Sequence, residues 1–566
     1  MLKKILIPFL IFSSLAELCH SQNVSNDTKL REIIYKKGQA EIIINGQNRK
    51  SIDKLTRIFS IRSIKEKAVH ILLSPLTVER FIAGGYDYQI SESADNKGVI
   101  SSANMTEAME WDSYPSYPQY DSIMRFLASS YPSLCMLDTI GTSINGRLVL
   151  ALKISDNCKV DETEPEVFYS SSIHGDETAG FILMLRLSEY LLKNYNLDSR
   201  VKNLVDNLEI WINPLANPDG MYRSSNFITS PIRFNANGYD LNRNFPDPEE
   251  AQGITRQKET LDMMSFLADH RFVLSANFHS GEEVVNYPWD RWPYEHADND
   301  WFYMICRAWA DTVHLYSRTG YMDYLDNGVT NGYDWYPVYG GRQDYVTYTL
   351  NGREITVELD KNFITPTSDL DNIWKYNYRS LLGYLENATY GIHGQVIDAL
   401  NNEPVPSLVF IEGHDIDNSQ VYSDTLTGFF TRLLLPGSYD LTFNAEGYRD
   451  TTVRDIGVIQ RERTDLTIEM FPDLNPADTT NPAKPLFYPN PGSIFIKAVL
   501  PEKIRGTVNI RLFNMTGKKV SDYDTEASDR NPVKLDVSRL PAGIYFVVFT
   551  NKETKQSCSG RIMILR

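Results

Sequence analysis

The sequence predicts a multidomain protein whose central part is an α/β domain, a layered sheet with helices on both faces, followed by two small all-β sandwich domains. In the middle of the chain, apolar strands alternate with segments that are apolar at helical spacing. After residue 390 the apolar runs become short and are separated by Gly, Pro, Asp and Asn. A chain of 566 residues also exceeds what one hydrophobic core can hold.

Residues 1–21 have the pattern of a signal peptide. Lys3 and Lys4 form the charged start, Ile5–Leu15 the apolar stretch, and Cys19-His20-Ser21 a tolerable cleavage site. The apolar stretch is too short for a permanent membrane anchor, and no later stretch looks transmembrane. We therefore expect an exported, soluble mature chain.

The chain carries a net charge of −17, from 56 basic and 73 acidic residues. This balance argues against nucleic acid and against an anionic membrane surface as partners. The mature chain keeps four cysteines, too few for a disulfide scaffold: Cys135, Cys158, Cys306 and Cys558. The first two fall near the open end of a predicted hairpin (Leu137–Ile140 with Leu148–Ile154), and a disulfide between them stays open.

Residues 22–108 alternate charged and β-branched stretches. The pattern predicts strands over Ala40–Ile44 and His70–Leu73 and a helix over Ser51–Ile58. We interpret this region as a small α+β unit ahead of the central domain. It contains no visible chemistry.

Residues 109–390 form the predicted central domain. Helices are expected at Ile123–Tyr131, Phe181–Tyr195, Glu259–His270, Trp301–Leu315 and Leu370–Leu385. Buried strands are expected at Glu166–Tyr169, Leu204–Pro214, Val273–Phe278 and Glu354–Leu359. Strands that alternate with helices predict a layered sheet covered on both faces.

Two all-β units and a linker complete the chain. Residues 391–470 contain short predicted strands at Gly394–Ile397, Leu408–Ile411 and Gly437–Phe443, a pattern typical of a small β-sandwich. Residues 471–485 are rich in Pro, Asp, Thr and Asn and are predicted to be a linker. Residues 486–566 form the second all-β unit.

The turn from Ser171 to Gly180 joins a predicted strand to a predicted helix and carries His174 and Glu177. Their spacing of three places both side chains on one side of the first helical turn, where they can share a zinc ion. The pair alone is common, and a polar helix start explains it equally well. A zinc site needs a third ligand, and His279, at the carboxyl end of the strand Val273–Phe278, is the candidate.

Four motifs then occur in order: His-Gly-Asp-Glu at 174–177, Asn-Pro-Asp-Gly at 217–220, Asp-Leu-Asn-Arg-Asn-Phe-Pro at 240–246 and Gly-Gly-Arg-Gln-Asp-Tyr at 340–345. Together these segments resemble the zinc metallocarboxypeptidases, in particular the regulatory branch with carboxypeptidases E, N and D, over roughly residues 114–470. The resemblance implies a mixed-sheet zinc carboxypeptidase domain over 109–390 and a transthyretin-like sandwich over 391–470. Residues 22–108 then look like a prosegment.

The resemblance also implies a metal site with one zinc ion per chain. Its ligands would be His174, Glu177 and His279, with Asp240 as the carboxylate that orients a ligand histidine through its other ring nitrogen. Asp176 departs from the digestive members of the family, which carry an arginine there. The regulatory branch varies at this position, so activity is still expected.

The remaining roles implied by the resemblance belong to catalysis and to the grip on the substrate terminus. Glu358 would be the general base, and Arg233 would stabilise the oxyanion. Asn242 and Arg243 would hold the terminal carboxylate of the substrate, and Tyr336 would close over it.

Asp290, eleven residues beyond His279, matches an aspartate that faces the removed side chain in basic-specific members of this branch. Gln343 takes the pocket-floor position. A buried acidic group favours a cationic side chain, so the expected activity removes C-terminal Arg and Lys from peptides and proteins. Two alternatives weaken this expectation. Asp290 could cap a loop turn, and Arg342 could point inward and repel a cation.

The last unit resembles the C-terminal sorting domain of type IX secretion in Bacteroidetes. The matching segments are Tyr488-Pro489-Asn490-Pro491, Asn514 to Lys518, Leu540 to Tyr545 and Gly560-Arg561. The resemblance implies the type IX machinery as a partner. It also implies a secreted or outer-membrane surface location in a Gram-negative bacterium. A carbohydrate- or partner-binding sandwich is the alternative.

The sequence therefore predicts an exported zinc carboxypeptidase that trims basic C-termini. One alternative is a cell-wall peptide carboxypeptidase, for which Asp290 would be a poor fit. Another is an inert surface binding protein that retains the fold and holds no stoichiometric zinc. The sequence leaves open the natural substrate, the oligomeric state and whether residues 22–108 inhibit the enzyme. It also leaves open whether the final form of the protein is released or attached to the cell surface.

Overall fold

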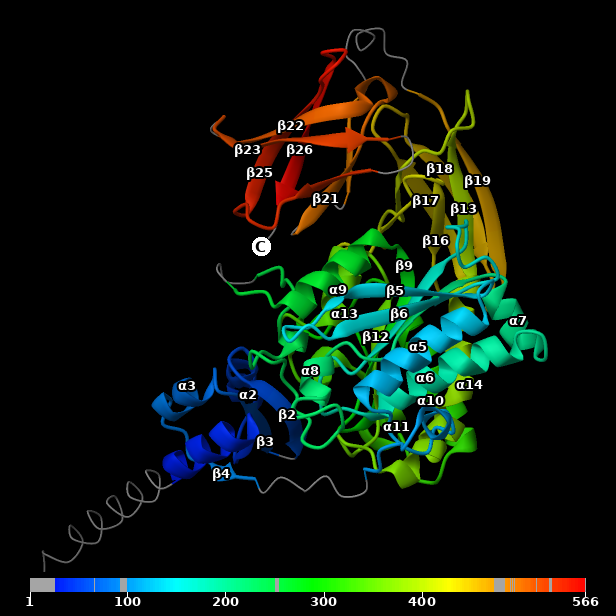
Figure 1. Cartoon of the computed structure of the whole chain (residues 1–566). Helices are drawn as coiled ribbons and strands as arrows, with labels where there is room; N and C mark the ends of the chain where they lie inside the picture. The colour runs from blue at the N-terminus through cyan, green and yellow to red at the C-terminus, as the bar shows by residue number, and fades with distance from the viewer. Residues whose placement is uncertain are drawn as a thin grey trace, which may run out of the picture.

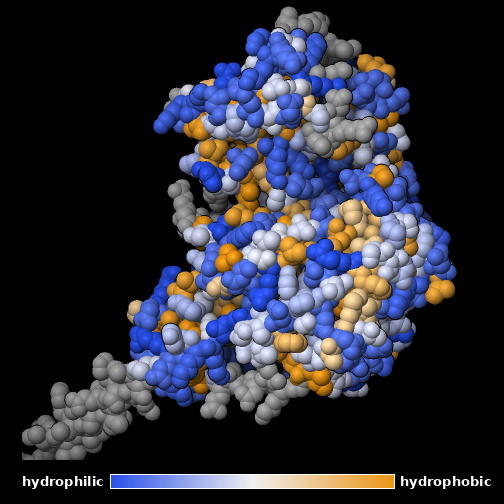
Figure 2. All heavy atoms as spheres, in the orientation of Figure 1, coloured by the Kyte–Doolittle hydropathy of each residue, from blue (hydrophilic) through white to orange (hydrophobic). Residues whose placement is uncertain are grey.

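The computed structural model describes residues 26–564 except 66, 92–98, 250–253, 473–483, 489, 491, 493, 516 and 529–531. The predicted signal peptide and most of the predicted linker lie outside the described residues. Figure 1 shows the blue N-terminal unit against the lower part of the large central domain, with two β-sandwiches above it. Hydrophilic side chains cover much of the face in Figure 2, and apolar ones are scattered over it.

The N-terminal unit is a four-stranded antiparallel sheet in the order β2-β3-β1-β4. The strands are β1 (Ala40–Ile44), β2 (Ser60–Lys65), β3 (Ala68–Leu73) and β4 (Gln89–Ile90), and the helices are α2 (Arg49–Thr56) and α3 (Val78–Ala83). Residues 26–37 are also helical. The first predicted strand is confirmed, and the predicted helix begins earlier because Asn48 and Ser51 form a capping box.

The central domain contains an eight-stranded mixed sheet in the order β11-β10-β12-β9-β7-β8-β6-β5. The strands are β5 (Cys135–Thr142), β6 (Leu148–Ile154), β7 (Glu166–Ser171), β8 (Glu209–Asn213), β9 (Phe272–His279), β10 (Glu283–Tyr287), β11 (Val329–Asn331) and β12 (Glu354–Leu359). The inner strands β12, β9, β7 and β8 run parallel, and β5, β6 and β10 pair antiparallel with their neighbours β6, β8 and β12. The mixed α/β fold class is thus confirmed.

Helices cover both faces of this sheet. One face packs against α5 (Tyr117–Ser130), α6 (Ala179–Asn194), α7 (Ser199–Val205), α10 (Asn299–Tyr316) and α14 (Leu370–Glu386), and the other against α9 (Lys258–Asp269). Strand β7 shows why: Val167 and Tyr169 join the first core, while Phe168 between them joins the second. Successive strand residues point to opposite faces, so a strand buried on both sides carries consecutive apolar residues, as at Val167 to Tyr169.

Two sequence predictions need correction at their starts. The strand predicted over Leu204–Pro214 begins only at Glu209, because Asp198 caps α7 by accepting a hydrogen bond from the Arg200 amide at 2.8 Å. Leu204 is therefore a buried helical residue. The helix predicted from Ile123 begins at Tyr117.

The four cysteines named above are buried and unpaired, so no disulfide joins Cys135 to Cys158.

Residues 391–470 form two facing sheets, β16-β13-β19 and β15-β14-β17-β18. The strands are β13 (Gly391–Asp398), β14 (Leu408–Phe410), β15 (Val421–Tyr422), β16 (Phe429–Arg432), β17 (Gly437–Asn444), β18 (Thr451–Val458) and β19 (Arg463–Met470). All three predicted strands of this region are present, and the second ends at Phe410, one residue earlier than predicted.

A buried ion network joins this sandwich to the central domain. Asp298, whose side chain is 1% exposed, accepts hydrogen bonds from Arg353 of the central domain at 2.7 Å and from Arg432 of the sandwich at 2.8 Å. His414 bonds its other oxygen at 2.9 Å. Burial opposes ionisation of Asp298, but Arg432 and Arg353 outweigh it and hold its pKa well below the usual range.

Replacing Asp298 by alanine should lower the free energy of unfolding by about 3–5 kcal/mol, because two buried arginines lose their shared carboxylate. The depressed pKa means that this stability is present at neutral pH and is lost only in strong acid. Denaturant titration of the full chain measures the change. The surface pair Arg454–Asp440 is the matched control, since Asp440→Ala should cost less than about 1 kcal/mol. Equal effects of the two substitutions would contradict the prediction.

The C-terminal unit is a second sandwich with sheets β20-β21-β24 and β23-β22-β25-β26. Its strands are β20 (Leu486–Tyr488), β21 (Phe495–Val499), β22 (Gly506–Asn514), β23 (Lys519–Ala527), β24 (Val533–Asp536), β25 (Gly543–Asn551) and β26 (Ser557–Ile564). Lys534 of this unit donates to Ser265 of α9 at 2.8 Å. Within the described ranges, no helix is both long enough and apolar enough to span a membrane.

Candidate functional site

His174 and Glu177 lie in the turn between β7 and α6, and the backbone of this turn is held at close range. A Cβ on Gly175 would lie 2.2 Å from the carbonyl carbon of Gly220, so the turn requires glycine there. Ser172 supports the turn from within, because its hydroxyl donates to the carbonyl oxygen of Glu177 at 3.0 Å. The turn that carries the His-Gly-Asp-Glu motif therefore depends on close packing against Gly220 of the Asn-Pro-Asp-Gly motif.

The Asn-Pro-Asp-Gly motif braces this turn. The Asn217 amide donates to the carbonyl oxygens of Ile173 and Arg233, both at 3.2 Å, and its oxygen accepts from the Gly220 amide at 2.9 Å. Asp219 anchors the motif through a 2.8 Å bond from Arg147. The sequence alone indicates no role for this motif, and in the structure it supports the turn that carries His174 and Glu177.

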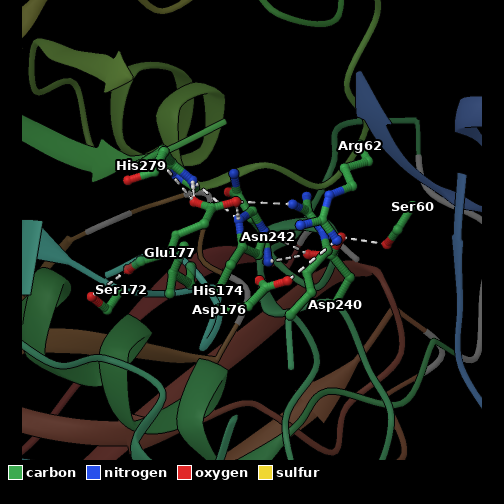
Figure 3. Close-up of polar contacts among 12 residues, drawn as sticks. Ser60, Arg62, Ser172, His174, Asp176, Glu177, Asp240, Asn242 and His279 are labelled. Atoms are coloured by element: carbon green, nitrogen blue, oxygen red, sulfur yellow. Dashed lines mark hydrogen bonds and ion pairs between the residues drawn. The ribbon is translucent and has the colours of Figure 1, made fainter. Parts of the chain in front are cut away.

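Three side chains converge on one point (Figure 3). Nδ1 of His174 lies 2.8 Å from Oε1 of Glu177, Nδ1 of His279 lies 2.7 Å from Oε2, and the two Nδ1 atoms are 3.1 Å apart. His279 comes from the end of β9, more than a hundred residues away. All three side chains are buried, and their donor atoms lie within 4.8 Å of one another.

This donor set fits zinc. Two imidazole nitrogens and a carboxylate are the protein ligands of many catalytic zinc sites, which keep a fourth position open. The outer nitrogen of His174 contacts Asp240 at 3.1 Å, and that of His279 contacts the Asn277 amide at 2.8 Å. Oδ1 of Asn277 is buried without a partner. With the amide turned over, this oxygen accepts the His279 Nε2 proton and leaves Nδ1 free to bind a metal.

Arg233 links the metal-ligand group to Asp240. Its Nη1 lies 3.1 Å from Glu177 and its Nε 2.9 Å from Asp240. Burial opposes ionisation of Asp240, yet Arg233 and His174 hold its pKa well below the usual range. The carboxylate is therefore charged, as the orienting role requires. Ser60 of the N-terminal unit donates to the same carboxylate at 2.5 Å.

Glu358 stands on β12 directly beside His279 in the parallel register. It lines the pocket that also contains His174 and Glu177, and its Oε2 is buried without a partner. Burial, with the nearby charges of Glu177 and Glu282, raises its pKa well above the usual carboxyl value. A carboxyl group with a raised pKa binds a proton more strongly than an ordinary one, which suits a group that takes part in proton transfer.

Asn242, Arg243 and Tyr336 line the same pocket. Nη1 of Arg243 donates to the carbonyl oxygen of Asn242 at 2.8 Å, while its Nε and Nη2 are buried without partners. Two adjacent free donors of a guanidinium match the two oxygens of a carboxylate. Tyr336 also packs against the apolar core of the N-terminal unit.

Asp290 is buried in the same pocket, where Oδ1 accepts hydrogen bonds from Asn286 at 3.0 Å and from Gln343 at 2.9 Å. A Cβ on Gly332 would lie 1.8 Å from that oxygen, so glycine keeps the space in front of it clear. Arg342 points elsewhere and forms two bonds with Glu354, at 2.9 and 3.0 Å. The structure thus removes the concern that Arg342 repels a cation.

The structure brings together every residue selected from the sequence and adds several that the sequence did not reveal. Asn277 and Asn286 hold His279 and Asp290 from neighbouring strand positions. The additions from the N-terminal unit are Ser60, Arg62 and Gln39; Ser60 and Arg62 reach in from β2 in Figure 3. Asn277 and Asn286 could have been found from the sequence, because each lies within a few residues of a predicted site residue. The sequence contains no comparable signal for the three residues of the N-terminal unit.

Comparison with known proteins supports the two family resemblances that the motifs suggested. Residues 120–380 match the family described as zinc carboxypeptidase, and residues 486–564 match the secretion system C-terminal sorting domain. The chain is 34% identical to carboxypeptidase D of Homo sapiens over 398 residues, covering 65% of this chain but 28% of that protein. It is also 34% identical to carboxypeptidase M of Mus musculus over 349 residues, 58% of this chain and 77% of that protein.

Among solved structures, carboxypeptidase A of Helicoverpa armigera aligns with a TM-score of 0.47 and 18% identity, over 61% of this chain and 97% of that one. The sequence matches confirm both resemblances seen in the motifs. The chain spans less than a third of the length of its carboxypeptidase D relatives.

Proposed function

Because the chain belongs to the zinc carboxypeptidase family, we propose that it is an exported metallocarboxypeptidase that hydrolyses the C-terminal peptide bond and prefers Arg and Lys. One observation carries the proposal. A single pocket is lined by the His–Glu–His group, by Arg243 with unpaired donors, by Glu358 and by Asp290. We also propose residues 22–108 as a prosegment-like region, 109–390 as the catalytic domain and 391–470 as a transthyretin-like sandwich.

His174, Glu177 and His279 would hold zinc, and Asp240 and Asn277 would fix the two rings from behind. Zinc held there supplies a Lewis acid that activates water and polarises the scissile carbonyl at neutral pH. The ligands are buried, so the surrounding protein limits access of bulk water to the reacting groups.

Glu358 takes a proton from the attacking water and later delivers it to the leaving amine. Its raised pKa makes the Glu358 carboxylate a stronger proton acceptor than an ordinary carboxylate, which favours the first of these transfers. Arg233 uses Nε and Nη1 in its two ion pairs, which leaves Nη2 to donate to the oxyanion.

The substrate end is held at two points. The free donors of Arg243 pair with the terminal carboxylate, and Asn242 lies beside them. Asp290, held by Asn286 and Gln343, faces the side chain to be removed and attracts a guanidinium or ammonium group.

Blocked dipeptides that end in Arg or Phe test the proposal, and a C-terminally amidated Arg peptide is the matched control. At about pH 8 we expect kcat/KM for Arg to exceed that for Phe by about 10²-fold. The amide should remain intact, because it offers Arg243 no carboxylate. A preference for Phe would contradict the pocket assignment, and equal cleavage of the amide would contradict exopeptidase action.

The same preference should depend on pH. Burial raises the pKa of Asp290 to about 7. Below that value the carboxyl is neutral and offers a cation no charge, so the Arg-to-Phe ratio should fall as the pH is lowered from about 8 to about 6. The Phe peptide corrects for titration of the shared catalytic groups. A ratio that stays constant across this range would show that Asp290 is not the selecting group.

The match of residues 486–564 to a sorting domain supports a secreted or cell-surface location. The type IX secretion machinery of a Gram-negative bacterium is the partner that this tail would engage, and peptide or protein C-termini are the substrates.

A further inference from the structure

The N-terminal unit lies across the candidate active site. Thr56 donates to the carbonyl oxygen of Pro337 at 2.7 Å, and Arg49 donates to that of Asp334 at 3.0 Å, both close to Tyr336. Gln39 accepts a hydrogen bond from the Arg233 amide at 2.9 Å. These contacts hold the N-terminal unit against the central domain, and Arg62 of its strand β2 is one of the pocket-lining residues.

Arg62 makes two contacts with the central domain. Its Nη1 lies 3.4 Å from Oδ2 of Asp176, and its guanidinium carbon lies 3.5 Å from the centre of the Phe363 ring. A carboxylate and an aromatic face that approach one guanidinium together form a site for a cation. The Phe363 backbone is fixed beside the metal-binding turn, because its carbonyl oxygen accepts from the Thr178 amide at 3.0 Å.

Asp176 depends on the N-terminal unit for its polar contacts. Its side chain is 2% exposed, and Oδ1 has no hydrogen-bond partner. Among the described residues, the contacts recorded for Oδ2 are with Arg62 and with Gln39, both at 3.4 Å and both from the N-terminal unit. A buried carboxylate without a cation is costly, so another cation is favoured wherever Arg62 withdraws.

A bound peptide would pass this point. If Arg243 and Asp290 hold the terminal residue, we expect the preceding residues to extend along the part of the pocket that Arg62 and Phe363 line. Asp176 adjoins the ligand Glu177, and Phe363 lines the same pocket.

Resting on the proposed carboxypeptidase function, we propose that Asp176 and Phe363 form a subsite for a basic side chain that precedes the scissile bond, and that Arg62 fills this subsite as an internal competitor. The enzyme would then favour C-termini with more than one basic residue, and such substrates would compete directly with the N-terminal unit.

Three blocked tripeptides test this with the zinc-loaded full chain: Ala-Ala-Arg, Ala-Lys-Arg and Lys-Ala-Arg. In Arg62→Ala, at least one lysine peptide should gain about tenfold in kcat/KM over Ala-Ala-Arg. Adding Asp176→Asn should remove that gain. Arg31→Ala is the matched control, because Arg31 pairs with Glu79 of its own unit; it should leave the ratios as in the wild type.

Equal rates on all three peptides in Arg62→Ala would overturn the subsite, as would a gain that survives Asp176→Asn. If no form cleaves any peptide, the proposed function fails, and equilibrium binding of the same peptides to zinc-loaded Arg62→Ala decides the subsite alone. About tenfold tighter binding of a lysine peptide would retain the cation site, and equal binding would overturn it.

Discussion

Replacing Glu358 by glutamine should lower kcat/KM for an Arg-terminated peptide by about 10²–10⁴-fold without loss of zinc or of fold. The amide has the shape of the carboxyl group but cannot accept a proton at neutral pH. Oε2 of Glu358 has no partner in the described structure, so the substitution breaks no recorded hydrogen bond of that oxygen. Amino acid release and zinc content, measured on the same preparation, test the prediction.

Glu282 provides the matched control for this substitution. It lines the same pocket but is only partly buried, and no catalytic role is assigned to it. Because Glu282 is only one of several influences on the pKa of Glu358, Glu282→Gln should lower the rate far less than Glu358→Gln. If Glu358→Gln kept the wild-type rate while Glu282→Gln lost it, the general base would have to be reassigned.

Replacing Asp290 by asparagine should reduce the Arg-to-Phe ratio by about 10²-fold, mainly through loss of activity on Arg. The substitution keeps the size of the side chain and removes its charge, so the Phe peptide should be cleaved at nearly the wild-type rate. The effect is large because the carboxyl group is buried and already oriented by Asn286 and Gln343.

Gln343→Ala separates charge from orientation. It removes one of the two bonds that hold Asp290 but leaves the carboxyl group in place, so the ratio should fall less than in Asp290→Asn. An unchanged ratio in Asp290→Asn would mean that another group selects the terminal side chain.

The sequence allowed His174, Glu177 and His279 to be grouped as one candidate metal site because their signals are local. His174 and Glu177 are three residues apart on one turn, and His279 ends a largely apolar strand. Arg233 and Asp240 could be assigned only through the family resemblance, since neither spacing nor periodicity places Arg233 against Glu177 or Asp240 against His174.

The contacts made by the N-terminal unit could not be predicted. Ser60 bonds a carboxylate 180 positions away, and Arg62 meets Asp176 and Phe363 from a different folded unit. How two units dock depends on the shapes of their folded surfaces. Hydrophobic periodicity and secondary-structure propensity describe single elements and do not predict those shapes. The strand start predicted at Leu204 was wrong for a simpler reason. A short apolar helix and a buried strand can have the same composition, and Asp198 was not identified as the N-cap of a helix.

Titration of the metal-free full chain with zinc, followed by arginine release from a blocked Arg dipeptide, tests the central claim most directly. We predict that activity is absent without metal, rises in proportion to added zinc and saturates at one equivalent per chain, and that His279→Ala neither binds this zinc tightly nor gains activity. Full activity in the chelated protein, or no arginine release from a chain that holds one zinc at His174, Glu177 and His279, would contradict the account.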